Sequence, residues 1–577
     1  MAKKTIKKNG QKYGGTPKAD IITVTAKKNT TVSGAGGNDT ITVKKGSKHT
    51  ITGAAGNDKI TVSKGSGHKI YGAAGKDKIY IKGSTASSKI YGDDAKGKVA
   101  GSDKITISGG KKNTIYGGKG ADTITVNGGS STIYGGKGND VFVIGKNSTG
   151  KATVMDLRAG AGNLDKVKIS GGAVKNIKAL GNNRIITGGQ SAQLTLKGAK
   201  PYKFIVADID GEYTVSSSSI DMTLKKNYTG SYYASSFVNN IDASYVKSEI
   251  TTVRGNTKNN RIKVAWVDGG TYQGGAGDDI ITATAGNNHH IYGEDESGPS
   301  KGNDTITVTG GNGHTIWGQY GDDNITVQNG TDHKIEGNDG NDTISVTGGR
   351  HHVISGNDGN DRISLEYVKG NGIQADGYGY SVYNSTITHV YAGDGNDTIT
   401  VRNSSNLRVN GGDGIDTSTV SNSSAVYIDN CGTVTVTNCK DTFIVPPSTE
   451  GNNVNRVTIS GTGNDVTIYQ SSNAKDIITV NWSNSFGKLY IDAGRLGETK
   501  YGDTLKINAS INDFNFYTDK VSGQDLYIIG KKGGSIVIDG YSYTGSNSAR
   551  ETSFINGITF NNGTFGLARL GNLPEKS

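Results

Sequence analysis

The sequence predicts an all-β protein made of parallel β-roll or β-solenoid arrays, with about 19 residues in each turn. The motif Gly337-Asn-Asp-Gly-Asn-Asp342-Thr-Ile-Ser-Val346 returns 19 residues later as Gly356-Asn-Asp-Gly-Asn-Asp361-Arg-Ile-Ser-Leu365. The apolar residues that follow each glycine-rich turn alternate with polar ones, as in a half-buried strand. The 577 residues include 88 glycines and only 6 prolines, and no segment has a helical apolar stripe of useful length.

Each period is expected to hold two short strands and two turns. Asp39 leads into Thr-Ile-Thr-Val, a polar turn follows at 44–48, and a second strand at 50–52 leads to the next glycine turn. One such unit cannot bury its apolar face, so the units should stack and bury it together. Stacking places one isoleucine per turn in an inward column: Ile41, Ile60, Ile79, Ile105, Ile124, Ile306, Ile325, Ile344 and Ile363.

An aspartate ends each glycine-rich turn. The series comprises Asp39, Asp58, Asp77, Asp103, Asp122, Asp140, Asp279, Asp304, Asp323, Asp342, Asp361, Asp397 and Asp416. Most neighbours are 18 or 19 residues apart. The gaps after Asp77 and Asp279 are longer, and the gap after Asp361 fits two turns with a degenerate one near Asp376.

These aspartates should form a column along one edge of the solenoid. Stacked strands lie about 4.8 Å apart, and carboxylates at that spacing repel one another unless cations lie between them. Calcium suits the site because it takes about six to eight oxygens, from carboxylates and backbone carbonyls alike. In the second array the third turn position is often acidic as well, which adds four candidate metal ligands: Asp339, Asp358, Asp394 and Asp413.

The turns and strands resemble the Gly-Gly-x-Gly-x-Asp-x-U-x nonapeptide repeats of RTX proteins, over roughly residues 20–144 and 272–420. The resemblance implies a parallel β-roll loaded with several calcium ions. It also implies an extracellular or cell-surface protein, secreted through a one-step (type I) channel without an N-terminal signal peptide. The basic start of the chain has no apolar core, and no apolar run reaches membrane-spanning length. The alternative is a metal-free solenoid that uses Gly and Asp only as turn formers.

The two arrays carry opposite charge. Residues 1–140 hold 25 lysines and 9 aspartates with no arginine or glutamate, a net charge of +16, whereas residues 271–416 have a net charge of −13. The lysines are spread through turns without a nucleic-acid-binding motif, so an anionic cell-surface polysaccharide is a better partner than nucleic acid. Opposite charges on one chain also permit head-to-tail self-assembly.

The chain is expected to form two tandem modules, each an array closed by a β-rich cap. The predicted segments are a basic array at 1–144, a cap at 145–215, a Ser/Tyr-rich linker and solenoid start at 216–270, an acidic array at 271–420, solenoid with degenerate turns at 421–480, and a C-terminal cap with a secretion signal at 481–577. Within the linker, residues 216–219 and 228–233 are expected to be loops. Cys431 and Cys439 flank a predicted strand, which favours two free thiols.

Two further columns follow from the same register. Outward aromatic residues suggest a ladder that binds a glycan or a protein, or that only stabilises the sheet: Tyr71, Tyr91, Tyr116, Tyr134, Tyr292, Trp317 and Tyr391. At the turn opposite the aspartates the residues are His49, His68, Ser88, Asn113, Ser131, His289, His314, His333 and His352. Histidines could bind zinc or nickel, but hydrogen bonding to the backbone is the role that Ser, Asn and His share.

No catalytic motif stands in its proper context. Residues 298–302 match Gly-x-Ser-x-Gly but lie in a turn insertion, and residues 145–152 resemble a phosphate loop that lacks its metal-binding hydroxyl. We therefore expect a non-enzymatic, structural or adhesive protein, such as a surface-layer component or adhesin. The competing hypothesis is a secreted enzyme on a β-helix, for example one that modifies polysaccharides.

Overall fold

The computed structural model describes residues 2–576 except 97, 158–164, 200–202, 248, 266, 296–300, 371–386, 448–453, 470–473, 493–502, 519–524, 540–554 and 566–572. The degenerate turn predicted near Asp376 and residues 298–300 of the hydrolase-like string lie outside this set. The chain divides into two compact units, Met1–Tyr228 with Tyr232–Ser248, and Thr229–Ser231 with Glu249–Ser577. The boundary lies inside the segment predicted as a linker, 216–270.

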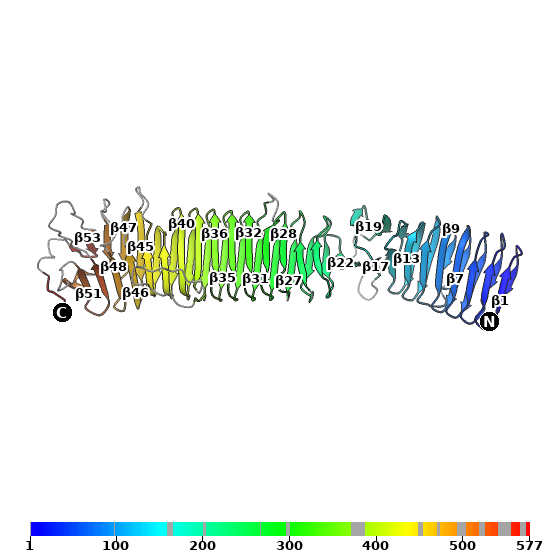
Figure 1. Cartoon of the computed structure of the whole chain (residues 1–577), viewed down its shortest axis with the longest axis horizontal. Helices are drawn as coiled ribbons and strands as arrows, with labels where there is room; N and C mark the ends of the chain where they lie inside the picture. The colour runs from blue at the N-terminus through cyan, green and yellow to red at the C-terminus, as the bar shows by residue number, and fades with distance from the viewer. Residues whose placement is uncertain are drawn as a thin grey trace. The chain divides into compact units, whose positions relative to one another are not determined.

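The first unit is built from two sheets whose strands alternate along the chain (Figure 1). One sheet contains β1 (Lys3–Ile6), β3 (Ile21–Val24), β5 (Thr40–Val43), β7 (Lys59–Ser66), β9 (Lys78–Ala86), β11 (Lys104–Ser108), β13 (Thr123–Gly128), β15 (Val141–Gly145), β17 (Lys166–Ser170), β21 (Phe204–Ala207), β22 (Gly211–Val215), β23 (Ile220–Leu224) and β25 (Asn240–Ala243). The other contains β2 (Lys12–Gly14), β4 (Thr31–Ser33), β6 (Thr50–Ala55), β8 (Lys69–Ala74), β10 (Lys89–Tyr91), β12 (Asn113–Lys119), β14 (Ser130–Lys137), β16 (Lys151–Val154), β20 (Ala192–Leu196), β19 (Asn183–Gly188) and β18 (Asn176–Leu180).

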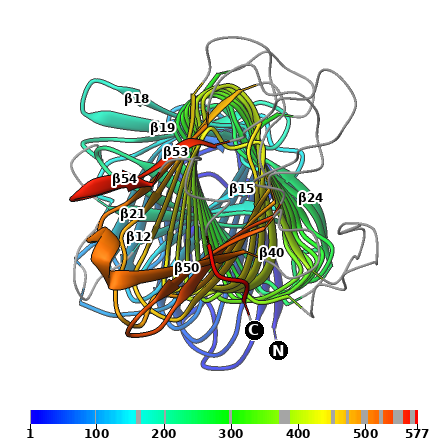
Figure 2. The ribbon, with the colours of Figure 1, turned by 90° about the vertical axis from the view of Figure 1, so that its left-hand side faces the viewer.

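The second unit repeats this design, and Figure 2 shows its two sheets as facing walls. One sheet contains β27 (Arg261–Ala265), β29 (Ile280–Thr284), β31 (Thr305–Thr309), β33 (Asn324–Gln328), β35 (Thr343–Thr347), β37 (Arg362–Glu366), β39 (Thr398–Arg402), β41 (Thr417–Ser421), β43 (Thr433–Thr437), β45 (Val454–Ser460), β47 (Lys475–Val480), β49 (Asp503–Ile507), β53 (Ile555–Phe560) and β54 (Gly563–Phe565). The other contains β26 (Ile250–Arg254), β28 (Thr271–Gly275), β30 (His290–Glu294), β32 (Thr315–Tyr320), β34 (Lys334–Asp339), β36 (Val353–Asp358), β38 (Thr388–Asp394), β40 (Ser405–Asp413), β42 (Ser424–Asp429), β44 (Lys440–Val445), β46 (Asn464–Tyr469), β48 (Gly487–Asp492), β52 (Ser535–Asp539), β51 (Leu526–Gly530) and β50 (Phe514–Thr518).

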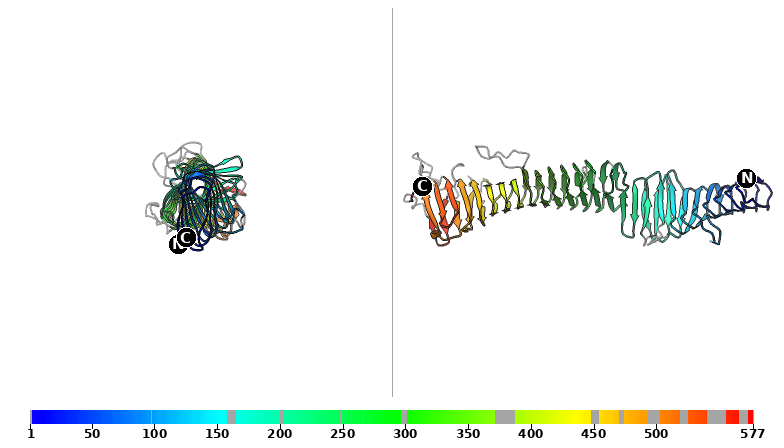
Figure 3. Two further views of the ribbon diagram at one scale, coloured as in Figure 1. Left: turned by 90° about the vertical axis from the view of Figure 1, so that its right-hand side faces the viewer. Right: turned by 90° about the horizontal axis from the view of Figure 1, so that it is seen from below.

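Most strand pairs are parallel, which confirms the predicted all-β solenoid. Consecutive turns lie directly on one another in strict register, as the rungs of each unit show (Figure 3). Antiparallel pairs occur at β18–β19–β20, β21–β22–β23, β50–β51–β52 and β53–β54. The organisation into two capped modules stays a prediction, because these pairings do not by themselves define caps. The only helix in the described part is the 3₁₀ turn η1 (Ile511–Asp513).

The predicted isoleucine column lies in the apolar core of each unit, together with other buried columns such as Ile51, Ile70 and Ile90. In the first unit Ile41 pairs in register with Ile60, and in the second Ile325 pairs with Ile344. Every member of the predicted column is 0–1 % exposed. Cys431 and Cys439 are buried free thiols, as predicted.

The expectation of a loop at 228–233 was wrong. Residues 230–233 form β24 (Gly230–Tyr233), in which Tyr232 is buried and Tyr233 is exposed. The alternation of buried and exposed side chains therefore continues through this Ser/Tyr-rich stretch, although its composition is typical of loops.

The glycine-rich turn imposes a left-handed backbone at its second position. This residue has φ of +83° at Ala54, +78° at Asn338 and +73° at Asn357. Asparagine tolerates that conformation better than alanine, whose Cβ crowds the backbone there. The first unit places alanine at this position three times, at Ala35, Ala54 and Ala73, so its turns carry more backbone strain.

Replacing Ala54 by Gly is expected to stabilise the fold by about 1 kcal/mol, because glycine adopts positive φ without a steric penalty. The matched control is Ala55→Gly, at the next position, where φ is not positive and added chain entropy should destabilise slightly. Thermal unfolding of both variants at one calcium concentration is the measurement. Equal shifts in the two midpoints would contradict the strain argument.

Candidate cation-binding column

The turn aspartates form a buried column in which each carboxylate accepts a hydrogen bond from the backbone of the turn before it. The backbone N–H of Asp39 donates to Oδ1 of Asp58 (2.6 Å), and that of Asp342 donates to Oδ1 of Asp361 (2.7 Å). The same bond recurs from turn to turn in both units. All thirteen predicted column aspartates are 2 % exposed or less.

The second carboxylate oxygen of most column members has no hydrogen-bond partner. The buried, unpartnered Oδ2 atoms belong to Asp39, Asp58, Asp77, Asp103, Asp122, Asp279, Asp304, Asp323, Asp342, Asp361, Asp397 and Asp416. A buried polar atom without a partner is costly, and a buried charge is costlier still. A repeated set of such atoms therefore points to a ligand that binds carboxylate oxygen.

Backbone carbonyls lie beside these orphan oxygens. A Cβ on Gly72 would clash with both Oδ2 of Asp77 and the carbonyl oxygen of Gly92, so the two oxygens converge on one α-carbon. Gly337 has the same relation to Asp342 and to Gly356 one turn later. Glycine is required at this first turn position because no side chain fits beneath the two oxygens.

The donor set fits calcium better than a metal held by side chains alone. Within the described residues no group of three His, Cys, Asp or Glu side chains is placed to hold a metal. A cation in this column therefore needs carbonyl oxygens together with carboxylates, which is the mixture that calcium accepts. The four third-position aspartates are exposed, in contrast to the column members, and each acts electrostatically on the column aspartate of its own turn: Asp339, Asp358, Asp394 and Asp413.

Burial raises the pKa of most column carboxyls above the ordinary value of an aspartate. Desolvation is the largest cause of each rise, and neighbouring carboxylates add to it at Asp122 and Asp323. The pKa of Asp103 rises to about 7, that of Asp122 to about 8, and that of Asp323 to about 9. Without a cation the column thus favours bound protons.

Four aspartates join the column that the sequence prediction missed. Asp20 and Asp165 extend it at the two ends of the first array, and Asp476 and Asp503 belong to it in the second unit. Each stands directly before an alternating strand, as in Asp503-Thr-Leu-Lys-Ile507. That strand signal identifies the position even where no regular glycine turn precedes it.

The opposite corner carries histidines in the same arrangement, and most of their ring nitrogens are hydrogen-bonded to the backbone, although Nε2 of His68 and His352 and Nδ1 of His289 have no partner. The N–H of His314 donates to Nδ1 of His333 (3.2 Å), and Nε2 of His333 lies 3.1 Å from the Asn329 carbonyl oxygen. Since Nδ1 accepts a hydrogen bond, the ring proton sits on Nε2 and donates to that carbonyl. Neighbouring rings stack at 4.8–5.0 Å. Burial lowers the pKa of His333 to about 4, so this imidazole is neutral near pH 7 and fits the hydrogen-bonding role.

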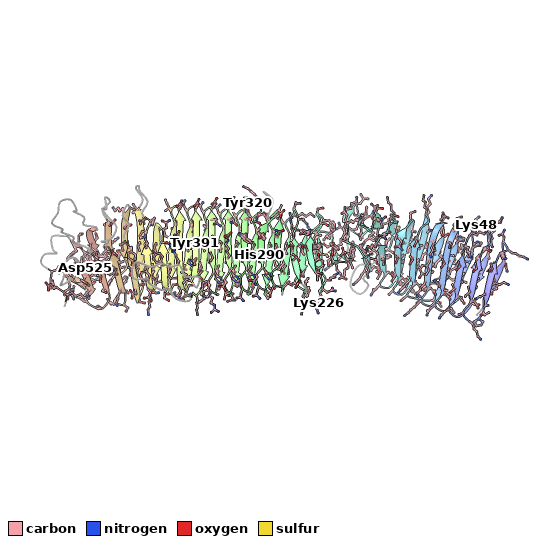
Figure 4. All side chains as sticks on the ribbon, viewed as in Figure 1. Lys48, Lys226, His290, Tyr320, Tyr391 and Asp525 are labelled. Atoms are coloured by element: carbon pink, nitrogen blue, oxygen red, sulfur yellow. The ribbon has the colours of Figure 1, made fainter. Side chains whose placement is uncertain are left out.

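The aromatic ladder is continuous in the first unit and interrupted in the second. Tyr71, Tyr91, Tyr116 and Tyr134 stack with ring centroids 4.7–5.0 Å apart. In the second unit Tyr292 stacks on Trp317 at 4.4 Å, but Glu336 and Ser355 occupy the register before Tyr391. Tyr391 stacks instead on His389, and it lies with His290 on a broad face of the unit (Figure 4).

Comparison with known families identifies the repeats. A family model for the RTX calcium-binding nonapeptide repeat matches four copies, at residues 107–143, 270–294, 334–350 and 388–407. Each matched copy contains at least one column aspartate: Asp122 and Asp140, Asp279, Asp342, and Asp397. No curated protein matches the chain. The predicted resemblance to RTX proteins is confirmed.

In excess chelator the fold should lose stability as pH rises from 6.5 to 9. The unfolded aspartates release their protons near pH 4, whereas folded Asp103, Asp122 and Asp323 hold theirs up to about 7, 8 and 9. The stabilising protons are therefore fully present at low pH and are lost through this window, in which the buried histidines are already neutral. Thermal midpoints in chelator at three pH values test this. A midpoint that rises with pH would contradict it.

Proposed function

We propose that this chain, which carries RTX calcium-binding repeats on a parallel β-solenoid, is a secreted structural or adhesive protein that completes its folding on calcium outside the cell. The observation that carries the proposal is the column of buried aspartates, twelve of which have an Oδ2 atom without a partner. Calcium bound along that column would satisfy those oxygens and offset their charge. Calcium is scarce in the cytosol and abundant outside, so folding would follow export.

The proposed ligands are Oδ2 of the thirteen column aspartates together with glycine carbonyls from adjacent turns. The exposed aspartates Asp339, Asp358, Asp394 and Asp413 would add negative charge around the second array. We place the tighter sites there, because more carboxylates raise calcium affinity and because the left-handed position is held by Asn338 and Asn357 rather than by alanine.

An adhesive role fits the outer surface of the first unit. Its tyrosine ladder is flanked by exposed Lys69 and Lys89, which precede Tyr71 and Tyr91 on the same sheet face. Neither lysine forms an ion pair among the described residues. Stacked rings bordered by lysines suit a linear anionic polysaccharide, since sugar rings pack on aromatic faces while lysines contact acidic groups. Self-assembly through the opposite charges of the two arrays belongs to the same proposal.

The competing function is an enzyme that modifies polysaccharides. Such an enzyme needs carboxylates clustered in a groove and away from a structural metal. The described buried carboxylates lie overwhelmingly in the column, where each is hydrogen-bonded to a neighbouring turn.

The described residues include no helix long and apolar enough to cross a membrane.

Calcium titration of the full chain tests the proposed folding switch. Circular dichroism at pH 8 should show an incomplete β signal with a low thermal midpoint in chelator and a cooperative gain as calcium is added, because metal binding and folding are coupled. Magnesium at the same concentrations is the control, since it dehydrates reluctantly and prefers rigid octahedral sites. A complete β signal in excess chelator would sink the proposal.

Binding to dextran sulfate, with neutral dextran as the control polymer, tests the adhesive role. Lys69→Gln with Lys89→Gln should weaken binding by several-fold at physiological salt, because both lysines border the ladder. Lys111→Gln with Lys112→Gln removes the same charge from an exposed turn, so its effect should be smaller. Equal losses in the two double variants would argue for general electrostatic attraction without a ladder site.

A further inference from the structure

Two turns of the aspartate column are interrupted by insertions, and both are built in the same way. The chain leaves the turn after Asp93 and after Glu294, and it returns at Gly101 and Gly302. The N–H of each returning glycine donates to the third-position carbonyl of the next turn, as in uninterrupted turns. Each insertion therefore removes the third residue from its turn and keeps the rest.

An acidic side chain turns inward at each interruption. Asp93 is 1 % exposed and Glu294 is 0 % exposed. They occupy the second turn position, where regular turns carry Ala, Asn, Gln or Gly with positive φ, but neither has a positive φ itself. The altered backbone aims the side chain into the turn.

Both carboxylates accept a hydrogen bond from a backbone N–H that, in regular turns, donates to a backbone carbonyl oxygen. Oδ2 of Asp93 accepts the N–H of Lys119 (2.6 Å), and Oε2 of Glu294 accepts the N–H of Tyr320 (3.2 Å). In a regular turn the equivalent N–H, that of Ala55, donates to a backbone carbonyl. Oε1 of Glu294 also accepts the N–H of Gly302 (2.8 Å), so both oxygens of that carboxylate are hydrogen-bonded. At Asp93 an amide would serve equally well as this acceptor, so hydrogen bonding alone does not explain the charge there.

The inward carboxylates lie beside the orphan oxygens of the column. Asp93 follows Gly92, whose α-carbon is crowded by Oδ2 of Asp103, and the Asp93 carboxylate itself packs against Gly118 in the next turn. Glu294 likewise follows Gly293, which is crowded by Oδ2 of Asp304. Oδ1 of Asp93 is buried without a hydrogen-bond partner. No ion pair between described residues involves either side chain.

We propose that Asp93 and Glu294 are additional ligands for a hard divalent cation of the calcium class, one in each unit, which replace the turn oxygen lost at the insertion. The inference rests on the proposed calcium column and adds a carboxylate to one site of each array. More carboxylates at a site raise its calcium affinity. The interrupted turns thus hold the tightest cation of their column.

The test compares calcium binding to full-length Asp93→Asn, Glu294→Gln and the control Asp94→Asn by calorimetry. Asn keeps an oxygen to accept the Lys119 N–H and Gln keeps one to accept the Tyr320 N–H, while both lose the charge. Gln also loses the acceptor of the Gly302 N–H, which still donates to the Tyr320 carbonyl. Asp94 is the adjacent residue, and Asn there can still accept the N–H groups of Lys96 and Lys98. We expect the dissociation constant of the tightest site class to rise about tenfold in Asp93→Asn and Glu294→Gln, and to stay within about twofold in Asp94→Asn.

Thermal midpoints with and without calcium keep the result interpretable if a variant is destabilised. A fall in the thermal midpoint that occurs only in the presence of calcium supports the proposal. Binding constants equal to those of the unmodified chain, or an equal loss of midpoint in calcium and in chelator, would overturn it and leave a hydrogen-bonding role. An unmodified chain that binds no calcium would instead defeat the proposed function itself.

Discussion

At one corner of every regular turn a buried carboxylate accepts the backbone N–H of the aspartate one turn before it. This bond fixes the register between turns, because a shift by one residue would leave the N–H and the carboxylate without partners. It also brings a negative charge into the protein interior at each turn. Glycine at the first turn position, the raised pKa values of the column and the need for a cation all follow from that one arrangement.

The two corners of the solenoid show how the same bond has different chemical consequences. Imidazole, hydroxyl and amide side chains at the histidine corner also accept a backbone N–H from the neighbouring turn, but they are neutral. Their second polar atoms mostly donate to backbone carbonyls, so that corner needs no further ligand. A carboxylate has no proton to donate, and its second oxygen stays unsatisfied. A buried anionic oxygen that lacks a partner turn after turn is therefore a feature of the aspartate corner.

The aspartate column of the first unit has different surroundings from that of the second. The first array has lysine-rich turns, left-handed alanines and an unbroken stack of four tyrosines. The second has acidic turns, left-handed asparagines and a ladder broken by Glu336 and Ser355. These differences are the basis for proposing an outer anionic partner for the first array and tighter calcium binding in the second.

The sequence by itself determined the period, the two strands per turn, the inward isoleucines and most of the aspartate column. Because the turns stack in parallel and in register, equivalent positions of successive turns lie in the same environment. The residue types that recur at one position therefore reveal whether that position is buried or exposed. The same register places Glu336 and Ser355 between Trp317 and Tyr391, so the break in the ladder was already encoded in the sequence.

Only the tertiary structure decided where several side chains point. Asp339 and Asp342 stand in one turn, yet the first is exposed and the second is buried, because the backbone reverses between them. Asp93 and Glu294 look like ordinary loop residues until the insertion redirects the chain and turns them inward. The direction of a side chain depends on the local φ values and on the turn that is stacked next to it, and neither is set by residue type alone.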